Sequence, residues 1–158
     1  DGACAPWRRR RAVCLFAQSQ MKQAQRTLTV PTRGPGLYEF TDALEDFVRG
    51  AEIETGLLTC FIRHTSASLL IQENADPDVC RDLQTFFAHL ATSGMNYRHT
   101  AEGPDDMPSH IRSALTQTSL GIPLHKGRLA LGTWQGIYVF EHRDAPHRRE
   151  VTLHVIGE

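Results

Sequence analysis

The sequence predicts a single α+β domain in which about three helices pack on a mixed or antiparallel β-sheet. Apolar residues recur at helical spacing in three segments, which predicts three amphipathic helices. Short apolar segments bounded by Gly, Pro or charged residues lie before and between these helices and predict strands. The end of the chain reads as strands alone, and such segregation of strands and helices is typical of an α+β fold.

The first half of the domain begins with a strand at 25–30, which ends at a Pro- and Gly-rich turn. A helix follows at 41–50, with Thr41 as its N-cap and Gly50 as its stop. The continuous apolar run 57–62 predicts a central strand covered on both faces, and 69–71 predicts the next strand.

The second helix starts at Asp76 and Pro77, where a capping carboxylate precedes a proline that tolerates the first turn. An apolar stripe then runs to Leu90 and predicts one buried face. A third helix opens within 105–108. We expect its buried face to consist of Met107, Ile111, Ala114 and Leu115.

The remaining strands are predicted at 122–124, 128–131, 137–142 and 150–155, as a run of sequence-adjacent hairpins. Regular patterning begins only at Met21, so we place the single domain at 21–158. We interpret residues 1–20 as a non-native or disordered N-terminal extension, with a docked N-terminal arm as the alternative.

Length and charge exclude several classes of protein. The chain has 158 residues, of which 41% are hydrophobic, and it has no apolar run near the ~20 residues of a spanning helix. Residues 1–20 carry a net charge of +3 and the remainder −4, and an acidic body argues against nucleic-acid binding. The apolar stretch 12–17 is too short for a secretory signal. We therefore expect a cytoplasmic protein with no membrane or nucleic-acid partner.

A polar pentapeptide, His64-Thr65-Ser66-Ala67-Ser68, lies between two apolar strands. Its burial would be costly unless every hydroxyl and ring nitrogen found a partner. One interpretation is a ligand cradle, in which Ser66 and Ser68 hold phosphate or carboxylate oxygens and His64 is a metal ligand or proton carrier. The other is a hairpin whose hydroxyls bond to their own backbone. Asn74 would face the same pocket if the two strands pair.

The segment 97–110 is the richest in metal-ligating groups. Asp106 and His110 are four residues apart, so on a helix they share one face. His99 in the preceding loop could complete three protein ligands and leave one position open for water or substrate. In the alternative interpretation, Asp105 or Asp106 only caps the helix and His110 lies on the surface.

Two further groups lie near the end of the chain. Trp134, next to Gln135 and between glycines, is either a core wedge or a wall of a ligand site. Strand periodicity places Glu141 on the apolar face of its strand, which is unfavourable unless the carboxylate meets a cation. Arg143, together with two arginines at 148–149, either binds an anion or forms a solvated turn.

Several chemistries lack their sequence motifs. The chain contains no GxGxxG, GxxxxGK[ST], GxSxG or SxxK pattern, which disfavours dinucleotide, P-loop and common serine-hydrolase chemistry. Cys60 lies in the most apolar segment, where a reactive thiolate is disfavoured, so Cys–His catalysis with His64 is a weak hypothesis.

The segments HTSASLLIQENADPDVCRDLQTFF, DDMPSHI and GTWQGI occur in this order. Together they resemble the YjbQ-like family, also called secondary thiamine-phosphate synthase enzymes, over about residues 22–158. The resemblance implies a compact α+β fold, a homotrimer with polar groups near a subunit boundary, and a bound metal. It also implies the joining of an aminopyrimidine diphosphate to a thiazole phosphate. The residues it assigns to the pocket are His64, Thr65, Ser66, Ser68, Asn74, His99, Asp105, Asp106, His110, Trp134, Gln135 and Glu141.

We therefore expect a metal-assisted enzyme that acts on a phosphorylated small heterocycle. Its divalent cation, Zn²⁺ or Mg²⁺, would be held by Asp106, His110 and His99 or His64, with Glu141 as a further catalytic group. The alternative is a trimeric module that binds a metal or a small anion for regulation, without turnover. A third interpretation is hydrolysis of a phosphoester or lactone by the same groups.

Overall fold

The structure is a computed structural model that describes residues 20–158. Most of the extension predicted for residues 1–20 therefore lies outside the described residues. The strands are β1 (Lys22–Pro31), β2 (Gly36–Glu39), β3 (Thr55–Ile62), β4 (Ala67–Glu73), β5 (Ser119–His125), β6 (Arg128–Leu129), β7 (Gln135–Glu141) and β8 (Arg148–Gly157). The helices are α1 (Thr41–Ala51), α2 (Pro77–Leu90) and α3 (Asp106–Ala114).

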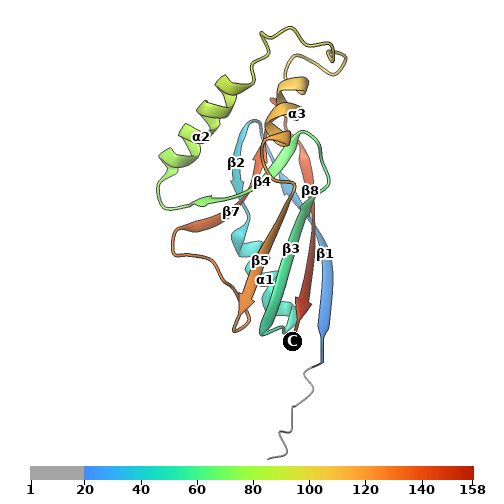
Figure 1. Cartoon of the computed structure of the whole chain (residues 1–158), viewed down its shortest axis with the longest axis vertical. Coiled ribbons are helices and arrows are strands. Elements are labelled where there is room, and N and C mark those ends of the chain that lie inside the picture. The colour runs from blue at the N-terminus through green and yellow to red at the C-terminus, as the bar shows by residue number, and fades with distance from the viewer. Residues whose placement is uncertain (1–19) are drawn as a thin grey trace, which may run out of the picture.

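The strands form two antiparallel sheets (Figure 1). One sheet has the strand order β1-β8-β3-β5-β6 and the other β2-β7-β4. Every paired neighbour is antiparallel. The predicted α+β class with three helices is confirmed, but the strands divide between two sheets instead of forming a single one.

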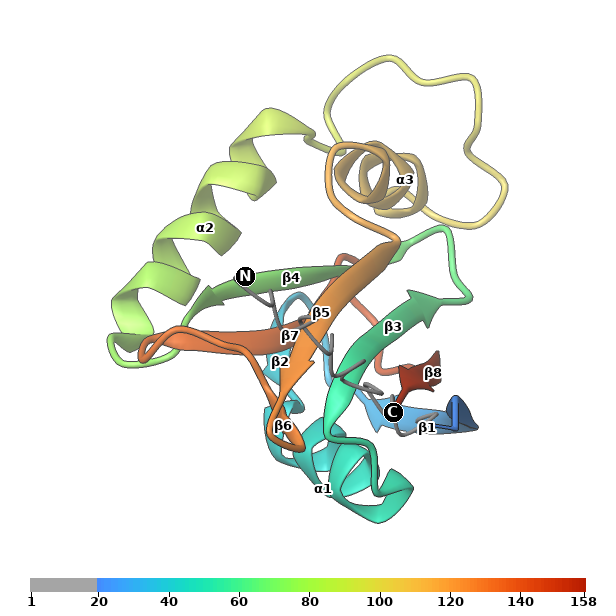
Figure 2. The same cartoon turned by 60° about the horizontal axis from the view of Figure 1, so that its bottom comes forward.

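The core lies between the inner faces of the sheets and is closed by α1. Strand alternation produces these faces: β8 buries Val151, Leu153 and Val155, while the residues between them point outward. From α1, Leu44 and Val48 are fully buried, each stabilising the fold by roughly 1.5–3 kcal/mol. Figure 2 shows α1 at the end of the sheets opposite to α2 and α3. Neither α2 nor α3 contributes a residue to this core.

The predicted run of hairpins is wrong beyond the first one. β5 and β6 pair as expected, but β7 pairs with β2 and β4, and β8 pairs with β1 and β3. The chain crosses to the second sheet after β6, and the segment 36–39, for which no strand was predicted, supplies an edge strand there. Sequence alternation identifies strands but does not contain the long-range pairing that assigns each one to a sheet.

Two predicted buried faces are exposed in the single chain. α2 begins as predicted, with the Asp76 side chain accepting a hydrogen bond from the Asp78 N–H at 2.9 Å, but none of its residues is buried. Phe86 in α2 is 61% exposed. Strand β3 is covered by other elements only on its inner face. Leu57 and Phe61, on its other face, are 42% and 48% exposed. None of the helices in residues 20–158 has the length and apolar character needed to cross a lipid bilayer, and the cytoplasmic location stays a prediction.

The predicted buried face of α3 is wrong. The helix buries Asp106, Ser109 and Ser113 together with Pro108, while Leu115 just after it is 59% exposed. A polar face turns inward because its hydroxyls reach backbone oxygens of the neighbouring strands, as described next.

Candidate functional site

Helix α3 is held on the sheets by hydrogen bonds from its buried serines. The Ser109 hydroxyl lies 2.8 Å from the His142 carbonyl oxygen, just after β7, and Ser113 donates to the Ala67 carbonyl oxygen of β4 at 3.1 Å. Since buried hydroxyls need such partners, the two bonds fix which side of the helix faces the sheet. This contact carries the first turn of α3 to the point where β4 begins and β7 ends.

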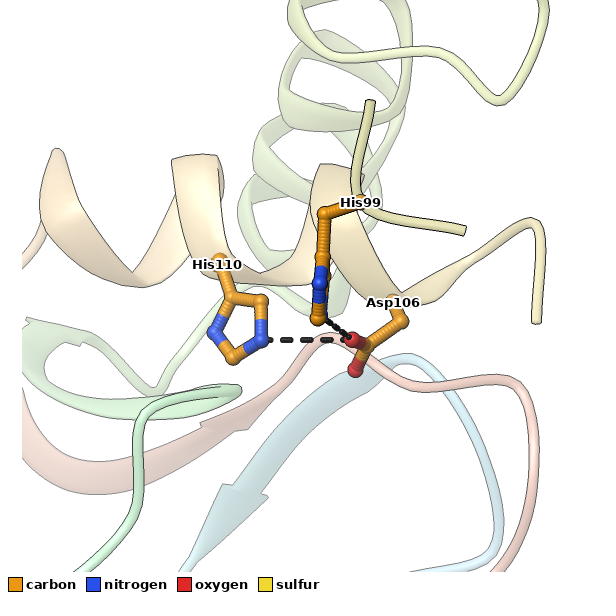
Figure 3. A group of neighbouring side chains, drawn as sticks. All are labelled: His99, Asp106 and His110. Atoms are coloured by element: carbon orange, nitrogen blue, oxygen red, sulfur yellow. Dashed lines mark hydrogen bonds and ion pairs between the residues drawn. The ribbon is translucent and has the colours of Figure 1, made fainter. Parts of the chain in front are cut away.

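His99, Asp106 and His110 converge at this point (Figure 3). The Nε2 atoms of His99 and His110 lie 2.8 Å and 3.3 Å from the same Asp106 oxygen, Oδ2. Asp106 is only 1% exposed. One ligand atom from each residue lies within 4.8 Å of the other two. The structure thus brings together the three residues whose spacing predicted a metal site.

The orientation of His110 suits a metal ligand. Its Nδ1 donates a hydrogen bond to the Thr65 carbonyl oxygen at 2.9 Å. A neutral ring held in this way carries its proton on Nδ1, so Nε2 presents a lone pair toward the Asp106 carboxylate. Two acceptor atoms facing one another require a proton or a metal cation between them. A backbone carbonyl that fixes the far nitrogen in this way is the usual arrangement around metal-binding histidines.

Arg143 fixes the carboxylates at the start of α3. Its Nη1 donates to Asp106 Oδ1, its Nε donates to Asp105 Oδ2 at 2.9 Å, and its Nη2 donates to the Glu102 carbonyl oxygen. Burial alone would raise the pKa of Asp105, but hydrogen bonds from the Asp144 N–H and from Arg143 hold that pKa below its ordinary value. Asp105 is therefore ionised at neutral pH. Because Arg143 binds Oδ1 of Asp106, the other oxygen, Oδ2, is left facing the histidines.

Glu141 meets the cation that its position in the sequence requires. This fully buried carboxylate accepts from Arg149 Nε and Nη2 at 2.7 and 2.6 Å, from Thr32 Oγ1 at 2.7 Å, and from the N–H groups of His142 and Arg143. Burial alone would raise the pKa of Glu141, but the Arg149 hydrogen bonds and the other donors lower it. Five hydrogen bonds occupy its acceptor positions, so the geometry suits positioning of Arg149 better than proton transfer.

His64 lies outside the histidine–aspartate cluster. Its Nε2 accepts a hydrogen bond from the Glu150 N–H at 2.8 Å, and its Nδ1 lies 3.4 Å from Arg149 Nη1. Burial, followed by the positive charge of Arg149, lowers the pKa of His64. Since the backbone of β8 uses the Nε2 lone pair, the expectation that His64 is a metal ligand does not agree with the geometry.

The serines of the pentapeptide have different environments. Ser66 accepts from Arg149 Nη2 at 3.2 Å and remains partly accessible, whereas Ser68 is fully buried and bonds to His142 Nε2 at 2.9 Å. Ser68 therefore cannot touch a surface ligand in this arrangement, contrary to the predicted cradle. A cleft of about 450 Å³ is lined by Phe61, Ile62, Arg63, His64, Thr65, Ser66 and Thr118.

The remaining predicted residues lie at the other end of β7. The register pairs Ala67 with Glu141 at one end of the β4–β7 ladder and Glu73 with Gln135 at the other. Six residues of strand separate the two ends by about 20 Å. The prediction that Asn74 shares a pocket with the histidines is therefore wrong for a single chain. Asn74 follows the last residue of β4, whereas the histidines lie near its first residue.

Contacts at that second end do not reach the histidine–aspartate cluster. Asn74 accepts nothing from the cluster; its N–H donates to the Trp134 carbonyl oxygen at 2.9 Å, and its side chain donates to Glu39. Gln135 accepts from the Gly132 N–H at 2.7 Å. Trp134 is 63% exposed, so it is not the core wedge considered above.

Some contributing residues carried only a weak signal in the sequence. Arg149 is 3% exposed and joins Glu141 to the pentapeptide, although its position in an arginine-rich turn equally predicted a solvated side chain. The signal that could have identified Arg149 was Glu141, because a carboxylate on an apolar strand face requires a nearby cation. Cys60 is fully buried, and burial raises the pKa of its thiol to about 12, which agrees with the weak case for Cys–His catalysis.

Comparisons with known proteins agree with this fold. The family model described as UPF0047 protein YjbQ-like matches residues 26–158. The chain belongs to the YjbQ-like family. It is 56% identical over 145 residues to the UPF0047 protein sll1880 of Synechocystis sp., covering 91% of this chain and 99% of the relative.

Two further matches extend the YjbQ-like assignment. The chain is 43% identical over 135 residues to the UPF0047 protein YjbQ of Escherichia coli, covering 85% of this chain and 98% of that protein. A crystal structure of a YbjQ-like protein from Sulfolobus solfataricus superposes with a TM-score of 0.81 at 22% identity, covering 88% of this chain and all of the other. At that identity the superposition is evidence for the fold alone, and it confirms the α+β architecture.

Proposed function

We propose that this YjbQ-like chain binds a divalent cation through His99, Asp106 and His110 and acts on a phosphorylated small heterocycle held beside it. The observation that carries the proposal is the approach of two imidazole nitrogens to one buried carboxylate oxygen. Two nitrogens and one oxygen match a catalytic zinc site with an open position, whereas magnesium prefers an all-oxygen shell. When bound, the cation supplies charge neutralisation for phosphate oxygens.

The chain's own residues supply binding and orientation. Arg143 holds Asp106 toward the histidines, and Arg149 holds Ser66 at the edge of the cleft. Thr65 is exposed there, so its hydroxyl and that of Ser66 are available to phosphate oxygens. The reaction we propose is the one the family resemblance implies: joining of an aminopyrimidine diphosphate to a thiazole phosphate, with pyrophosphate as the leaving group.

We further propose a homotrimer in which a neighbouring subunit brings its Trp134 toward this site. Support comes from large apolar side chains that a single chain leaves exposed, since monomers rarely expose extended apolar patches. They are Met21, Leu57, Phe61, Phe86, Leu90, Met95, Leu115, Trp134 and Ile156. Sedimentation equilibrium tests the assembly: a trimeric mass is expected, and a monomeric mass at micromolar concentration contradicts it.

A second candidate function is a trimeric module that binds a metal or a small anion without turnover. One observation favours it: the two proton carriers expected at the site, Glu141 and His64, are both engaged in fixed hydrogen bonds. Such groups position their neighbours but are poorly placed to exchange protons with a substrate.

The deciding experiment supplies purified protein with both thiamine precursors and either Zn²⁺ or Mg²⁺. We expect product formation that is lost in Asp106→Ala and His110→Ala and retained in His125→Ala, an exposed histidine away from the cluster. Unchanged product formation in the first two variants contradicts the enzyme. Stoichiometric metal binding without turnover favours the binding module. Absence of metal binding overturns the enzyme, and absence of both metal and phosphate binding overturns the module as well.

A further inference from the structure

The segment that joins α2 to α3, residues 91–105, contains neither a helix nor a strand. Figure 2 shows it as a wide arc beyond α3, away from both sheets. Residues 92–96 and 98–102 are all exposed. A loop of this length without secondary structure is uncommon in a compact domain, and it is usually either functional or a disordered linker. Its contacts with the rest of the chain decide between these two.

Both ends of the loop are anchored. Arg112 Nη2, on α3, donates to the carbonyl oxygen of the buried Ala91 at 2.6 Å. Arg143 Nη2 donates to the Glu102 carbonyl oxygen at 2.9 Å. Movement of the loop is therefore confined to the residues between these two anchors.

The middle of the loop has one hydrogen bond to the rest of the described chain. From residue 92 to residue 101, the bond that leaves the loop joins His99 Nε2 to Asp106 Oδ2 at 2.8 Å. Other hydrogen bonds of this stretch stay within it, such as the one from Tyr97 Oη to Met95 Sδ at 3.1 Å. A single hydrogen bond contributes little net free energy, whereas each ordered residue costs conformational entropy. The chain's own contacts therefore hold the middle of the loop weakly.

The loop encloses a hollow of its own. The volume of this hollow is about 390 Å³, and all of its lining residues lie between Ser93 and Pro104. None of the loop residues belongs to the hydrophobic core of the described chain. Packing against the core therefore does not replace the missing hydrogen bonds, and His99, in the wall of the hollow, is the residue that joins the middle of the loop to α3.

His99 is also one of the three proposed metal ligands, and the other two, Asp106 and His110, belong to α3. The buried serines of α3 fix this helix on the sheets, so two of the ligands stay in place when the loop moves. A site that includes a weakly held segment converts the free energy of metal binding into ordering of that segment.

We propose that residues 91–105 form a flap, which His99 fixes on α3 when the cation is bound and which is released when the cation is lost. Closure of the flap then supplies the third ligand, so assembly of the site and ordering of the loop are one event. This inference rests on the proposed metal site.

Linkage makes the proposal quantitative. If the cation favours the closed flap, the closed flap binds the cation more tightly by the same factor. His99→Ala leaves only the two ligands on α3 and therefore imitates the open flap. We expect Zn²⁺ affinity to fall at least about tenfold in this variant. Saturating Zn²⁺ should reduce the open population of the unchanged chain by the same factor.

Trypsin measures that open population. Arg98 is exposed in the middle of the loop, and cleavage of a transiently opened segment follows the population of its open form. The full chain is digested with and without saturating Zn²⁺, and mass spectrometry follows cleavage after Arg98. Zn²⁺ should slow this cleavage at least about tenfold.

Two variants show whether His99 is responsible. In His99→Ala, cleavage after Arg98 should be equally fast with and without Zn²⁺, which also shows that the metal does not inhibit trypsin. Thr100→Ala changes the exposed neighbour of His99 and should be protected by Zn²⁺ as the unchanged chain is.

Isothermal titration calorimetry on the same samples separates the possible failures. If Zn²⁺ binds, and binds more weakly in Asp106→Asn, but does not slow cleavage after Arg98, the flap is contradicted and the metal site stands. Protection that persists in His99→Ala also contradicts the flap, because the loop is then fixed without this ligand. If Zn²⁺ does not bind, the metal site and the flap are both overturned.

Discussion

The two ends of β7 differ in almost every physical respect. At the Glu141 end, charged groups are buried and satisfied: Glu141 is 0% exposed and Arg149 is 3% exposed. At the Gln135 end, Trp134 is 63% exposed, and the side-chain hydrogen bond between Asn74 and Glu39 is exposed as well. Both ends carried attractive sequence motifs. Distant segments meet at both ends, so the difference between them is the burial of charged groups, and a sequence motif alone does not indicate that burial.

The largest effect should come from breaking the buried ion pair. Glu141→Ala leaves Arg149 buried without its carboxylate, and loss of one partner of a buried pair costs about 3–5 kcal/mol. Urea unfolding measures this cost. The matched control is Glu150→Ala, whose ion pair with Arg63 is about half exposed and should cost less than about 1 kcal/mol. Equal losses in the two variants would show that burial of the Glu141–Arg149 pair adds nothing to the cost of breaking it.

The next effect concerns metal affinity. Asp106→Asn keeps the shape of the side chain but removes the charge on the oxygen that both histidines approach, so we expect affinity for Zn²⁺ to fall at least about 100-fold. Isothermal titration calorimetry gives the value. Asp78→Asn, on the exposed start of α2, should bind as the unchanged chain does. A fall of less than threefold in Asp106→Asn would exclude this carboxylate as a ligand.

Acid should act on the Glu141 end through His142. Its pKa is about 3 in the folded chain against 6.5 ordinarily, so between these values the unfolded chain binds more protons. This contribution to stability is fully present above pH 6.5 and is lost as the pH falls toward 3. Between pH 6.5 and 5 the loss is about 1.5 kcal/mol.

Urea midpoints at these two pH values, compared with His142→Gln, isolate that contribution. The variant cannot titrate at this position but can still bond to Ser68, so it should show a correspondingly smaller dependence on pH. His125→Gln, an exposed histidine, should keep the full dependence. If His142→Gln is as acid-sensitive as the unchanged chain, the ring is not held neutral in the folded state.

The smallest effect is expected at the opposite end of β7. Trp134→Ala removes a side chain that is mostly exposed in the single chain, so the stability of the monomer should change by less than about 0.5 kcal/mol. Since Trp134 is not one of the proposed ligands, Zn²⁺ affinity should change by less than about twofold. A large loss of metal affinity in this variant would show that the two ends are not independent in the assembled protein.

The sequence predicted most of the local structure. Periodicity identified the three helices, and Asp76 with Pro77 correctly marked the start of α2. The i,i+4 spacing of Asp106 and His110 placed both on one helical face, and His99 joined them. These features depend on residues close together in the chain, where backbone geometry alone determines which side chains meet.

Long-range features could not be predicted in this way. Pairing of β7 with β4 separates Asn74 from the histidines, and no local pattern contains that register. Likewise α3 turns serines inward because Ser109 and Ser113 find carbonyl oxygens on other elements. His64 was expected in the cluster, but a backbone N–H from β8 uses its Nε2. Each error arose where a partner distant in the chain outweighed the local signal.

The most direct test of the central claim is a crystal structure with Zn²⁺ added at one equivalent, with data collected on both sides of the zinc absorption edge. The proposed function requires one anomalous peak about 2.0–2.1 Å from His99 Nε2, Asp106 Oδ2 and His110 Nε2. A peak held by other residues, or none at this position, would contradict it.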